Sequence, residues 1–252
     1  NDLVELGEGI APSDITVVQA NSGKDLMLLV NGTTDQLKLY ETTDDSTHRI
    51  ERVIFADGTI WTHAEMFALA TVPTAGDDTF YGGYKSESLA GGEGNDTLIG
   101  NNGNDILAGG AGNDSLRGGG DDDTYIFDVG SGQDVIYDYI SNTLVNYGGD
   151  DAVIFAAGID PSEITVIQGD TGDDLIIRIS GTTDQITLNE TVSDPNSRIE
   201  RVLFADGTVL THSNLLQMAT TATPGNDVFY GGGGADSLSG GAGNDTLIAN
   251  KG

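Results

Sequence analysis

The stretch that decides the fold is Gly91-Gly92-Glu93-Gly94-Asn95-Asp96-Thr97-Leu98-Ile99. Its pattern of glycines, an aspartate at the sixth position and a large apolar residue at the eighth returns with variations at residues 100–108, 109–117, 231–239 and 240–248. The glycines allow a tight turn, and the last three residues can extend with the apolar side chain pointing inward. The nine-residue period therefore predicts a solenoid of short stacked strands.

The stacking of these turns predicts a requirement for a cation. Two nonapeptides would make one coil, so each motif would lie beneath the second motif after it. Neighbouring strands lie about 4.8 Å apart, which brings the sixth-position aspartates of successive coils close together. Two carboxylates at that spacing repel each other. Ca²⁺ accepts several oxygen ligands and would convert the repulsion into a bridge, so the repeat predicts a calcium-binding parallel β-roll.

The composition of the chain agrees with a cation as its partner. There are 40 acidic and 10 basic residues among 252, which gives a formal net charge of −30. This charge excludes a nucleic-acid or anionic-membrane binder that works through ordinary electrostatics. The chain has no cysteine, so neither disulfides nor thiolate metal sites can stabilise it. No apolar run approaches the roughly 18 residues of a membrane span.

A second, longer repeat divides the chain into units. Residues 2–103 align without a gap with residues 151–252, a shift of 149 positions, and the segment 55–59 returns unchanged as 204–208. We expect a β module at 1–72, a roll at 73–137, a second module at 138–221 and the start of a second roll at 222–252. The N-terminal residues show no signal peptide, and both ends fall inside a unit, so we expect an excised piece of a longer tandem array.

Each module is predicted to hold short strands and one short helix. In the first module the alternation of apolar residues predicts strands at 15–18, 26–30, 36–40 and 49–56. Asp57-Gly58 predicts a hairpin turn. Thr62 is expected to cap a helix at 63–70, as Thr211 would for residues 212–218. The predicted fold class is thus all-β, with calcium-binding rolls alternating with small strand-rich modules that carry one short helix.

The nonapeptide resembles the haemolysin-type calcium-binding repeat of the repeats-in-toxin family. The modules, with Gly-Ile-x-Pro-Ser-Asp/Glu-Ile-Thr-Val and Arg-Ile-Glu-x-Val-x-Phe-Ala-Asp-Gly-Thr, resemble the calcium-binding-related domain found between such rolls. In that family each ion is held by sixth-position aspartates and by backbone carbonyls near positions one to four of two stacked loops. The resemblance therefore implies several Ca²⁺ ions and export from a bacterial cell.

Applied to this chain, the resemblance implies ligands in the stacked loops of both rolls. Along one edge of the first roll it places Thr74, Gly76 and Asp78 on Gly91, Glu93 and Asp96, then Gly92, Gly94 and Asp96 on Gly109, Ala111 and Asp114. Along the opposite edge it places Asn101, Gly103 and Asp105 on Gly118, Gly120 and Asp123. The neighbouring positions of these loops are Gly100, Asn102, Gly110 and Gly112. In the second roll it places Thr223, Gly225 and Asp227 on Gly240, Ala242 and Asp245, with Gly232, Gly234 and Asp236 lacking a complete next coil.

Two nonapeptides depart from the pattern. At 82–90, Lys85 replaces a glycine and Glu87 replaces the aspartate, so the site formed by Glu87 and Asp105 fits least well. At 118–126, Asp121 stands where glycine is expected. The segment Tyr-x-Phe-x-x-Gly-x-Gly-x-Asp-x-Ile that follows resembles the way such rolls close, which implies that Asp134 is an irregular ligand.

The glycine-aspartate tract, the two helix-start histidines and the acidic runs each have a second interpretation. A solvated linker rich in glycine and aspartate would not place an apolar residue two positions after nearly every motif aspartate. His63 and His212 could suggest a metal ligand or a general base, but positions in the first turn of a helix explain them better. The runs 121–123 and 150–151 could mimic an acid/base pair, but their glycine-rich surroundings favour ligands or solvated charges.

The leading functional hypothesis is a non-enzymatic, calcium-dependent structural segment of a large secreted bacterial protein, such as an adhesin, a matrix protein or a filament. It would fold on binding Ca²⁺ outside the cell, at the cell surface or in the medium. Its expected partners are calcium and further copies of itself, end to end or laterally, with no nucleic acid and no membrane span. The alternative is an accessory region of a secreted enzyme or toxin. A third possibility is ligand binding by the modules, for which Trp61 offers thin support.

Overall fold

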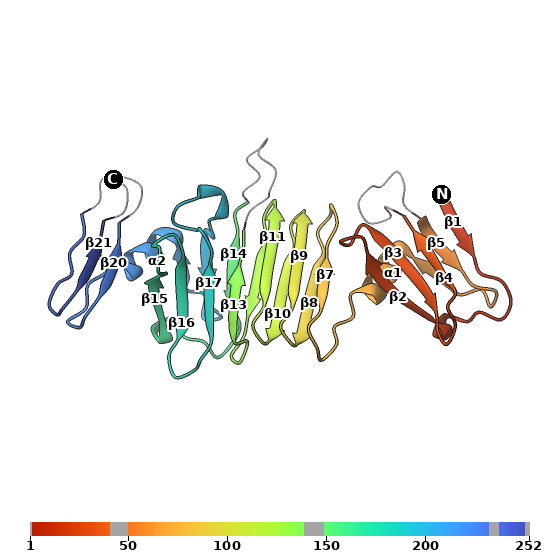
Figure 1. Ribbon diagram of the computed structural model, residues 1–252, viewed down its shortest axis with the longest axis horizontal. Helices are drawn as coiled ribbons and strands as arrows, with labels where there is room; N and C mark the ends of the chain where they lie inside the picture. Colours follow the sequence, from red (N-terminus) through yellow and green to blue (C-terminus); the bar gives the residue numbers. More distant parts are fainter. Residues whose placement is uncertain (1, 41–49, 139–148, 232–236, 250–252) are drawn as a thin grey trace.

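The computed structural model describes residues 2–40, 50–138, 149–231 and 237–249 of the chain. Its units follow one another along the longest axis of the molecule, from the first module through the roll to the second module and the second roll (Figure 1). Strands predominate, and each module carries one α-helix. The predicted all-β architecture of parallel rolls alternating with strand-rich modules is confirmed. In the described part of the chain, neither helix is long and apolar enough to cross a bilayer.

The first module consists of two small sheets and one helix. In one sheet, β1 (Asp2–Glu5) pairs in parallel with β5 (Ile50–Ile54), which pairs antiparallel with β6 (Ile60–Thr62). The other sheet is antiparallel and contains β2 (Ile15–Ala20), β3 (Asp25–Val30) and β4 (Gln36–Leu39). A single 3-10 turn, η1 (Pro12–Asp14), precedes β2.

The local signals of the first module act as predicted. Gly58 adopts a φ of +89° in the turn between β5 and β6, a conformation that costs glycine little. Helix α1 (His63–Ala70) begins after Thr62, whose hydroxyl accepts a hydrogen bond from the backbone N–H of Glu65. Both sheets and α1 enclose a core of their own, made of Val17, Leu26, Leu28, Leu39, Val53, Phe55, Met66 and Ala70. The first module therefore has a buried core of its own, while Phe67 of α1, which is partly buried, packs against the core of the roll.

The roll consists of two parallel sheets that face each other across a narrow apolar core. The chain alternates between the sheets, so each nonapeptide adds one strand to one of them. One sheet contains β8 (Ser88–Glu93), β10 (Ile106–Ala111) and β12 (Thr124–Phe127). The other contains β7 (Thr79–Tyr81), β9 (Thr97–Asn102), β11 (Ser115–Gly120) and β13 (Gln133–Ile136).

The second module continues both sheets of the roll. Strand β14 (Ala152–Phe155) pairs in parallel with β12, and beyond it lie β18 (Arg201–Leu203) and β19 (Val209–Thr211). On the other face β17 (Gln185–Leu188) pairs in parallel with β13, followed by β16 (Leu175–Ile179) and β15 (Ile164–Gln168). The remaining elements of this module are η2 (Pro161–Glu163), η3 (Pro195–Ser197) and α2 (His212–Ala219).

The core runs without interruption across this junction. In one sheet the register aligns Leu89, Leu107, Tyr125, Val153 and Val202, all of which are buried. In the other sheet it aligns Phe80, Leu98, Leu116, Ile136 and Leu188. Burial of each large apolar side chain contributes about 1.5–3 kcal/mol. The predicted boundary between residues 137 and 138 therefore separates two kinds of sequence that share one pair of sheets and one core.

The opposite end of the roll is covered by a side chain of the first module. Strand β7 lies at the edge of its sheet, where an unpaired backbone could join other strands. The side-chain amide of Gln19 donates to the carbonyl oxygen of Tyr81 at 2.6 Å, and its Oε1 accepts from the Tyr81 N–H at 2.9 Å. Gln168 and Tyr230 form the same pair at the start of the second roll, which contains β20 (Val228–Tyr230) and β21 (Thr246–Ile248).

Candidate metal centre

The sixth-position carboxylates of the roll form two columns, one on each edge. The first acidic column contains Asp78, Asp96, Asp114 and Asp134. Each backbone N–H donates to Oδ1 of the next aspartate, at 2.8 Å from Asp78 to Asp96, 2.8 Å from Asp96 to Asp114 and 2.9 Å from Asp114 to Asp134. The column thus repeats one contact from coil to coil, because the parallel register keeps equivalent residues one strand spacing apart.

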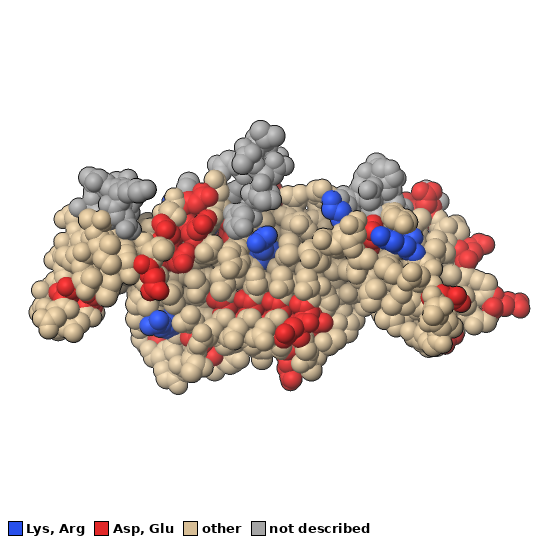
Figure 2. Space-filling view, in the orientation of Figure 1, with Lys and Arg blue, Asp and Glu red and all other residues tan. Residues whose placement is uncertain are grey.

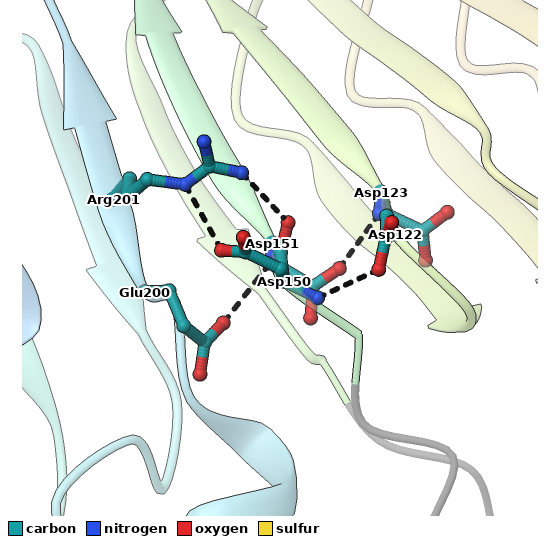
Figure 3. Close-up of polar contacts among 6 residues, drawn as sticks. All are labelled: Asp122, Asp123, Asp150, Asp151, Glu200 and Arg201. Atoms are coloured by element: carbon teal, nitrogen blue, oxygen red, sulfur yellow. Dashed lines mark hydrogen bonds and ion pairs between the residues drawn. The ribbon is translucent and has the colours of Figure 1, made fainter.

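The second acidic column contains Glu87, Asp105, Asp123, Asp151 and Glu200. The same N–H to carboxylate bond joins Glu87 to Asp105 at 2.7 Å, Asp105 to Asp123 at 2.8 Å and Asp123 to Asp151 at 2.7 Å. The Asp151 N–H then donates to Oε2 of Glu200 at 2.9 Å. The last two members belong to the second module, and Figure 3 shows the column passing from Asp123 to Asp151 and Glu200. A row of acidic side chains crosses the middle of the molecule in Figure 2.

The columns leave one oxygen of each central aspartate without a partner. Oδ2 is buried and makes no hydrogen bond in Asp96, Asp105, Asp114 and Asp123. Each of these oxygens lies against the glycine that opens its own nonapeptide, and a Cβ on Gly91 would overlap both Oδ2 of Asp96 and the carbonyl oxygen of Gly109. Carboxylate and carbonyl oxygens therefore converge where only glycine leaves room. Buried oxygen atoms without hydrogen-bond donors are the environment that Ca²⁺ stabilises.

Burial raises the pKa values of these carboxyl groups. Burial raises the pKa of Asp105 to about 7, that of Asp123 to about 8 and that of Asp134 to about 7, and neighbouring carboxylates add to each shift. Burial likewise raises the pKa of Asp96 and of Asp114. In the absence of a cation, the folded columns therefore hold protons more tightly than free aspartate does. A bound divalent ion would provide the compensating charge and release those protons.

The structure brings together the predicted ligand sets of the first roll. Gly92 pairs with Gly110 and Glu93 with Ala111, while Asn101 pairs with Gly119 and Asn102 with Gly120. At the N-terminal end, Thr74 donates its backbone N–H to Asp78 at 2.7 Å. The positions that stack in these loops and lie beside the columns include Gly76, Gly94, Gly100, Gly103, Gly109, Gly112 and Gly118. Their backbone oxygens can serve as ligands, and their coordination of an ion remains a prediction.

The second roll repeats the start of the first. The Thr223 N–H donates to Asp227 at 2.8 Å, and the Asp227 N–H donates to Oδ1 of Asp245 at 3.0 Å. A Cβ on Gly240 would overlap Oδ2 of Asp245, as at the other turns. Gly225 lies directly against Gly243, next to Ala242. The predicted ligands Gly232, Gly234 and Asp236 lie outside the described residues.

The departures from the repeat have local explanations. Lys85 lies in the loop before β8, an edge strand, and a Cβ on Gly103 in the next coil would overlap its backbone carbonyl. Glu87 keeps its place in the second column despite its longer side chain. Asp121 replaces a glycine, adopts a φ of +72°, and accepts a hydrogen bond from the Gly103 N–H at 3.1 Å. Asp134 enters the first column after a spacing of 20 residues in place of 18, because two extra residues precede it.

Sequence reasoning missed Asp138 and Glu200 near the end of the second column, and it named Asp151 only within the run 150–151, as a ligand or a solvated charge. Residues 149–154 read Gly-Asp-Asp-Ala-Val-Ile, which is the second half of a nonapeptide without its opening glycines. A Cβ on Gly149 would overlap the carbonyl of Asp121, so this glycine stacks as the roll glycines do. Asp2 and Glu51, the counterparts of Asp151 and Glu200 in the 149-residue repeat, are hydrogen-bonded in the same way. The half motif at 149–154 could have shown from the sequence that Asp151 joins the column, whereas no sequence pattern marks Asp138.

Comparisons with known families match both parts of the chain. The model of the RTX calcium-binding nonapeptide repeat (4 copies) matches residues 74–98, 81–116, 90–125, 99–136 and 221–252. The model of the haemolysin-type calcium binding protein related domain matches residues 25–65 and 174–214. The iron-regulated protein FrpA of Neisseria meningitidis serogroup C is 35% identical over 123 residues, which are 48% of this chain and 10% of that protein. The match thus covers about a tenth of the length of this relative.

Two solved structures are similar to part of the chain. The AlgE6R3 subunit of the Azotobacter vinelandii mannuronan C5-epimerase matches with a TM-score of 0.37 and 28% identity, covering 54% of this chain and 82% of that one. The extracellular lipase LipA of Serratia marcescens matches with a TM-score of 0.34 and 21% identity, covering 77% of this chain and 32% of that one.

Proposed function

Because the chain belongs to the repeats-in-toxin family of haemolysin-type calcium-binding repeat proteins, we propose that it is a non-enzymatic structural segment whose rolls fold on binding Ca²⁺ outside a bacterial cell. The observation that carries the proposal is the set of buried, unpartnered Oδ2 atoms of Asp96, Asp105, Asp114 and Asp123. They lie at equivalent places in successive coils, where a polar atom would be costly to bury without an ion or a proton.

The mechanism follows from the coupling of binding to folding. Without calcium, folding must bring the carboxylates of both columns together in a chain that already carries a net charge of −30. With calcium, each ion neutralises its carboxylates and joins two coils, so the binding energy becomes folding energy. Extracellular calcium modules typically bind with a dissociation constant of about 10⁻⁴ to 10⁻³ M. Such affinities would keep the rolls unfolded in a cytosol poor in calcium and folded outside it.

The structural role is supported by the continuity of the fold. One core cluster runs from Phe80 in β7 to Phe204 and Ala219 in the second module. The two candidate bases of the sequence, His63 and His212, are the first residues of α1 and α2. Burial, together with the positive charge of Arg198, lowers the pKa of His212. Its place against the module core supports a packing role for this histidine.

The proposal is tested by removing calcium from the whole chain. Far-ultraviolet circular dichroism and thermal melting would be recorded in about 5 mM CaCl₂, in excess EGTA and in about 5 mM MgCl₂. These ion concentrations exceed the dissociation constants of extracellular sites, which reach about 10⁻³ M. We expect the most β structure and the highest melting temperature in calcium, because Mg²⁺ sheds its water shell reluctantly. Unchanged spectra and melting temperature after chelation would overturn the proposal.

A second proposal concerns assembly into an array, as in an adhesin or a filament. In the second module, β14 and β17 are covered by β12 and β13 of the roll. Their counterparts in the first module, β1 and β4, are edge strands in the described part of the chain, and Leu3 and Leu37 are exposed on them. The exposed edges of β1 and β4 are therefore equivalent to the edges of β14 and β17 that pair with the end of a roll. Electron microscopy with and without calcium should show end-to-end particles only with calcium, and uniformly monomeric particles in both conditions would contradict this role.

The alternative role, an accessory region of a secreted enzyme or toxin, differs in what surrounds the segment. A full-length reading frame made of further 149-residue units would favour the structural role. A catalytic signature in a separate domain would favour the accessory role.

A further inference from the structure

We propose that Asp123, Asp138 and Asp151 form a calcium site at the junction between the roll and the second module. Each of the three side chains can contribute one carboxylate oxygen to a group in which all these oxygens lie within 4.8 Å of one another. The three residues are only 1%, 2% and 1% exposed. The inference rests on the proposed function for the identity of the ion, and it adds a site that the nonapeptide pattern does not contain.

The oxygen atoms of this group are arranged for a cation. Oδ1 of Asp123 already accepts the Asp105 N–H, and Oδ2 of Asp123 is buried without a hydrogen-bond partner. A Cβ on Gly118 would overlap both this Oδ2 and the hydroxyl oxygen of Tyr125, so these two oxygen atoms lie close to each other beside Gly118. The buried oxygen without a hydrogen-bond partner therefore lies beside the hydroxyl that contacts Asp138, an observation separate from the clustering of the three acids.

Tyr125 orients the third carboxylate. Its hydroxyl accepts a hydrogen bond from the Gly118 N–H at 2.8 Å and donates one to Oδ1 of Asp138 at 2.8 Å. The tyrosine thus fixes the orientation of the Asp138 carboxyl group, whose side chain also forms a hydrogen bond with that of Asp151. Tyr125 is 1% exposed and belongs to the apolar ladder of the roll, so its ring position is set by packing. A rigid donor of this kind positions a ligand without occupying the site.

The positively charged side chain of Arg201 lies at this junction but pairs with Asp150, outside the cluster. Nε of Arg201 lies 2.9 Å from Oδ1 of Asp150, and Nη2 of Arg201 donates to the Asp150 carbonyl oxygen at 3.2 Å (Figure 3). Asp150 points to the exposed side, with 59% of its side chain accessible. Three buried carboxylates thus lie together while the arginine pairs with the exposed one. Ca²⁺, which binds six to eight oxygen atoms at about 2.3–2.6 Å, fits an all-oxygen group of this charge.

An ion at this place would join three segments of the chain. Asp123 precedes β12, Asp138 follows β13, and Asp151 precedes β14. The site would therefore link both sheets of the roll to the first strand of the module. Calcium would then control the attachment of the module as well as the stacking of the coils.

The test counts bound ions on the full chain and locates the one that is lost. Equilibrium dialysis with ⁴⁵Ca²⁺ would compare the wild type with Asp138→Asn and with Asp150→Asn, a neighbouring change of equal charge outside the cluster. We expect Asp138→Asn to bind one ion fewer and Asp150→Asn to bind as many as the wild type. Hydrogen exchange should show lower protection of β14 in Asp138→Asn and unchanged protection of β9 and β10.

The outcomes separate the site from the proposed function. Calcium binding by the wild type with an unchanged ion count in Asp138→Asn would overturn the junction site alone, whereas no calcium binding by the wild type would overturn both. If Asp138→Asn does not fold in calcium, Tyr125→Phe replaces it, since this variant keeps all three carboxylates. We expect Tyr125→Phe to weaken one site about tenfold, the usual loss for a partner that orients a ligand. Affinity equal to the wild type at every site would overturn the inference.

Discussion

At the scale of single residues, the nonapeptide is a device for placing one carboxylate per turn. The opening glycine of each copy is needed because the aspartate five positions later folds back over it. Asp96 over Gly91, Asp105 over Gly100 and Asp114 over Gly109 repeat this arrangement. One carboxylate oxygen of each aspartate accepts the N–H of the aspartate in the preceding coil, and the other is buried without a hydrogen bond. The spacing of glycine and aspartate thus has a steric cause and an electrostatic one.

The steric cause predicts the effect of one methyl group. A Cβ on Gly109 would overlap Oδ2 of Asp114, although Gly109 does not have a positive φ. We expect Gly109→Ala to destabilise the calcium-loaded protein by about 1–3 kcal/mol, the usual range for overpacking. Gly7→Ala is the matched control, since no atom lies within 4 Å of a Cβ there. Equal urea midpoints for the two variants in calcium would count against this explanation.

The raised pKa values predict opposite effects of pH with and without calcium. The pKa values of Asp105, Asp123 and Asp134 rise from 3.8 to about 7, 8 and 7. A carboxyl group with a raised folded-state pKa stabilises the fold below its unfolded pKa, and this contribution is lost as pH rises through the folded value. The calcium-free chain should therefore melt at a higher temperature at pH 5 than at pH 8.

Calcium should reverse the sign of this dependence, because the ion binds only the deprotonated carboxylates. We expect calcium affinity, measured by titration calorimetry, to increase between pH 5 and pH 8. Affinity that is independent of pH over this range would show that these carboxylates are not the ligands.

At the scale of secondary-structure elements, the two modules cover edge strands of the roll. Strand β7 is capped by the amide of Gln19, and β12 and β13 are extended by β14 and β17. Uncapped parallel strands present unpaired N–H and C=O groups that invite association with other chains. The modules therefore act as end pieces for the rolls as well as spacers between them.

The amide cap predicts a specific loss of stability. Gln19→Ala removes two hydrogen bonds to Tyr81, at about 0.5–1.5 kcal/mol each. We expect the calcium-loaded protein to lose about 1–3 kcal/mol by urea unfolding, on the same basis. Gln217→Ala, at an exposed position of α2, is the control and should have little effect. A Gln19→Ala variant no less stable than Gln217→Ala would contradict the role of the cap.

At the scale of the whole molecule, the described chain contains two cores of different extent. One lies within the first module, and the other joins the roll to the second module and is contacted by Phe67 of the first module. Trp61 is the single tryptophan of the chain and packs edge-on against Phe55 in the first core, with ring centroids 4.6 Å apart. Its fluorescence therefore reports on the first module separately from the roll.

The division into two cores predicts two unfolding transitions. On titration with EGTA, circular dichroism should follow the loss of the roll together with part of the second module. Trp61 fluorescence should not follow this loss, because its core contains neither acidic column. Coincident transitions by both probes would show that the first module and the roll unfold as one cooperative unit.

The sequence by itself determined the coil, its two-strand period, the glycine turns and the column aspartates that lie within the regular nonapeptides, because all of these depend on spacings within nine or eighteen residues. It also determined the module strands and the helix caps at Thr62 and Thr211, which are local signals. Only the tertiary structure decided that β14 and β17 extend the roll, and that Asp138 and Asp151 meet Asp123. Parallel pairing joins segments far apart in the chain, and the depth at which a carboxylate is buried depends on which strand lies beside it.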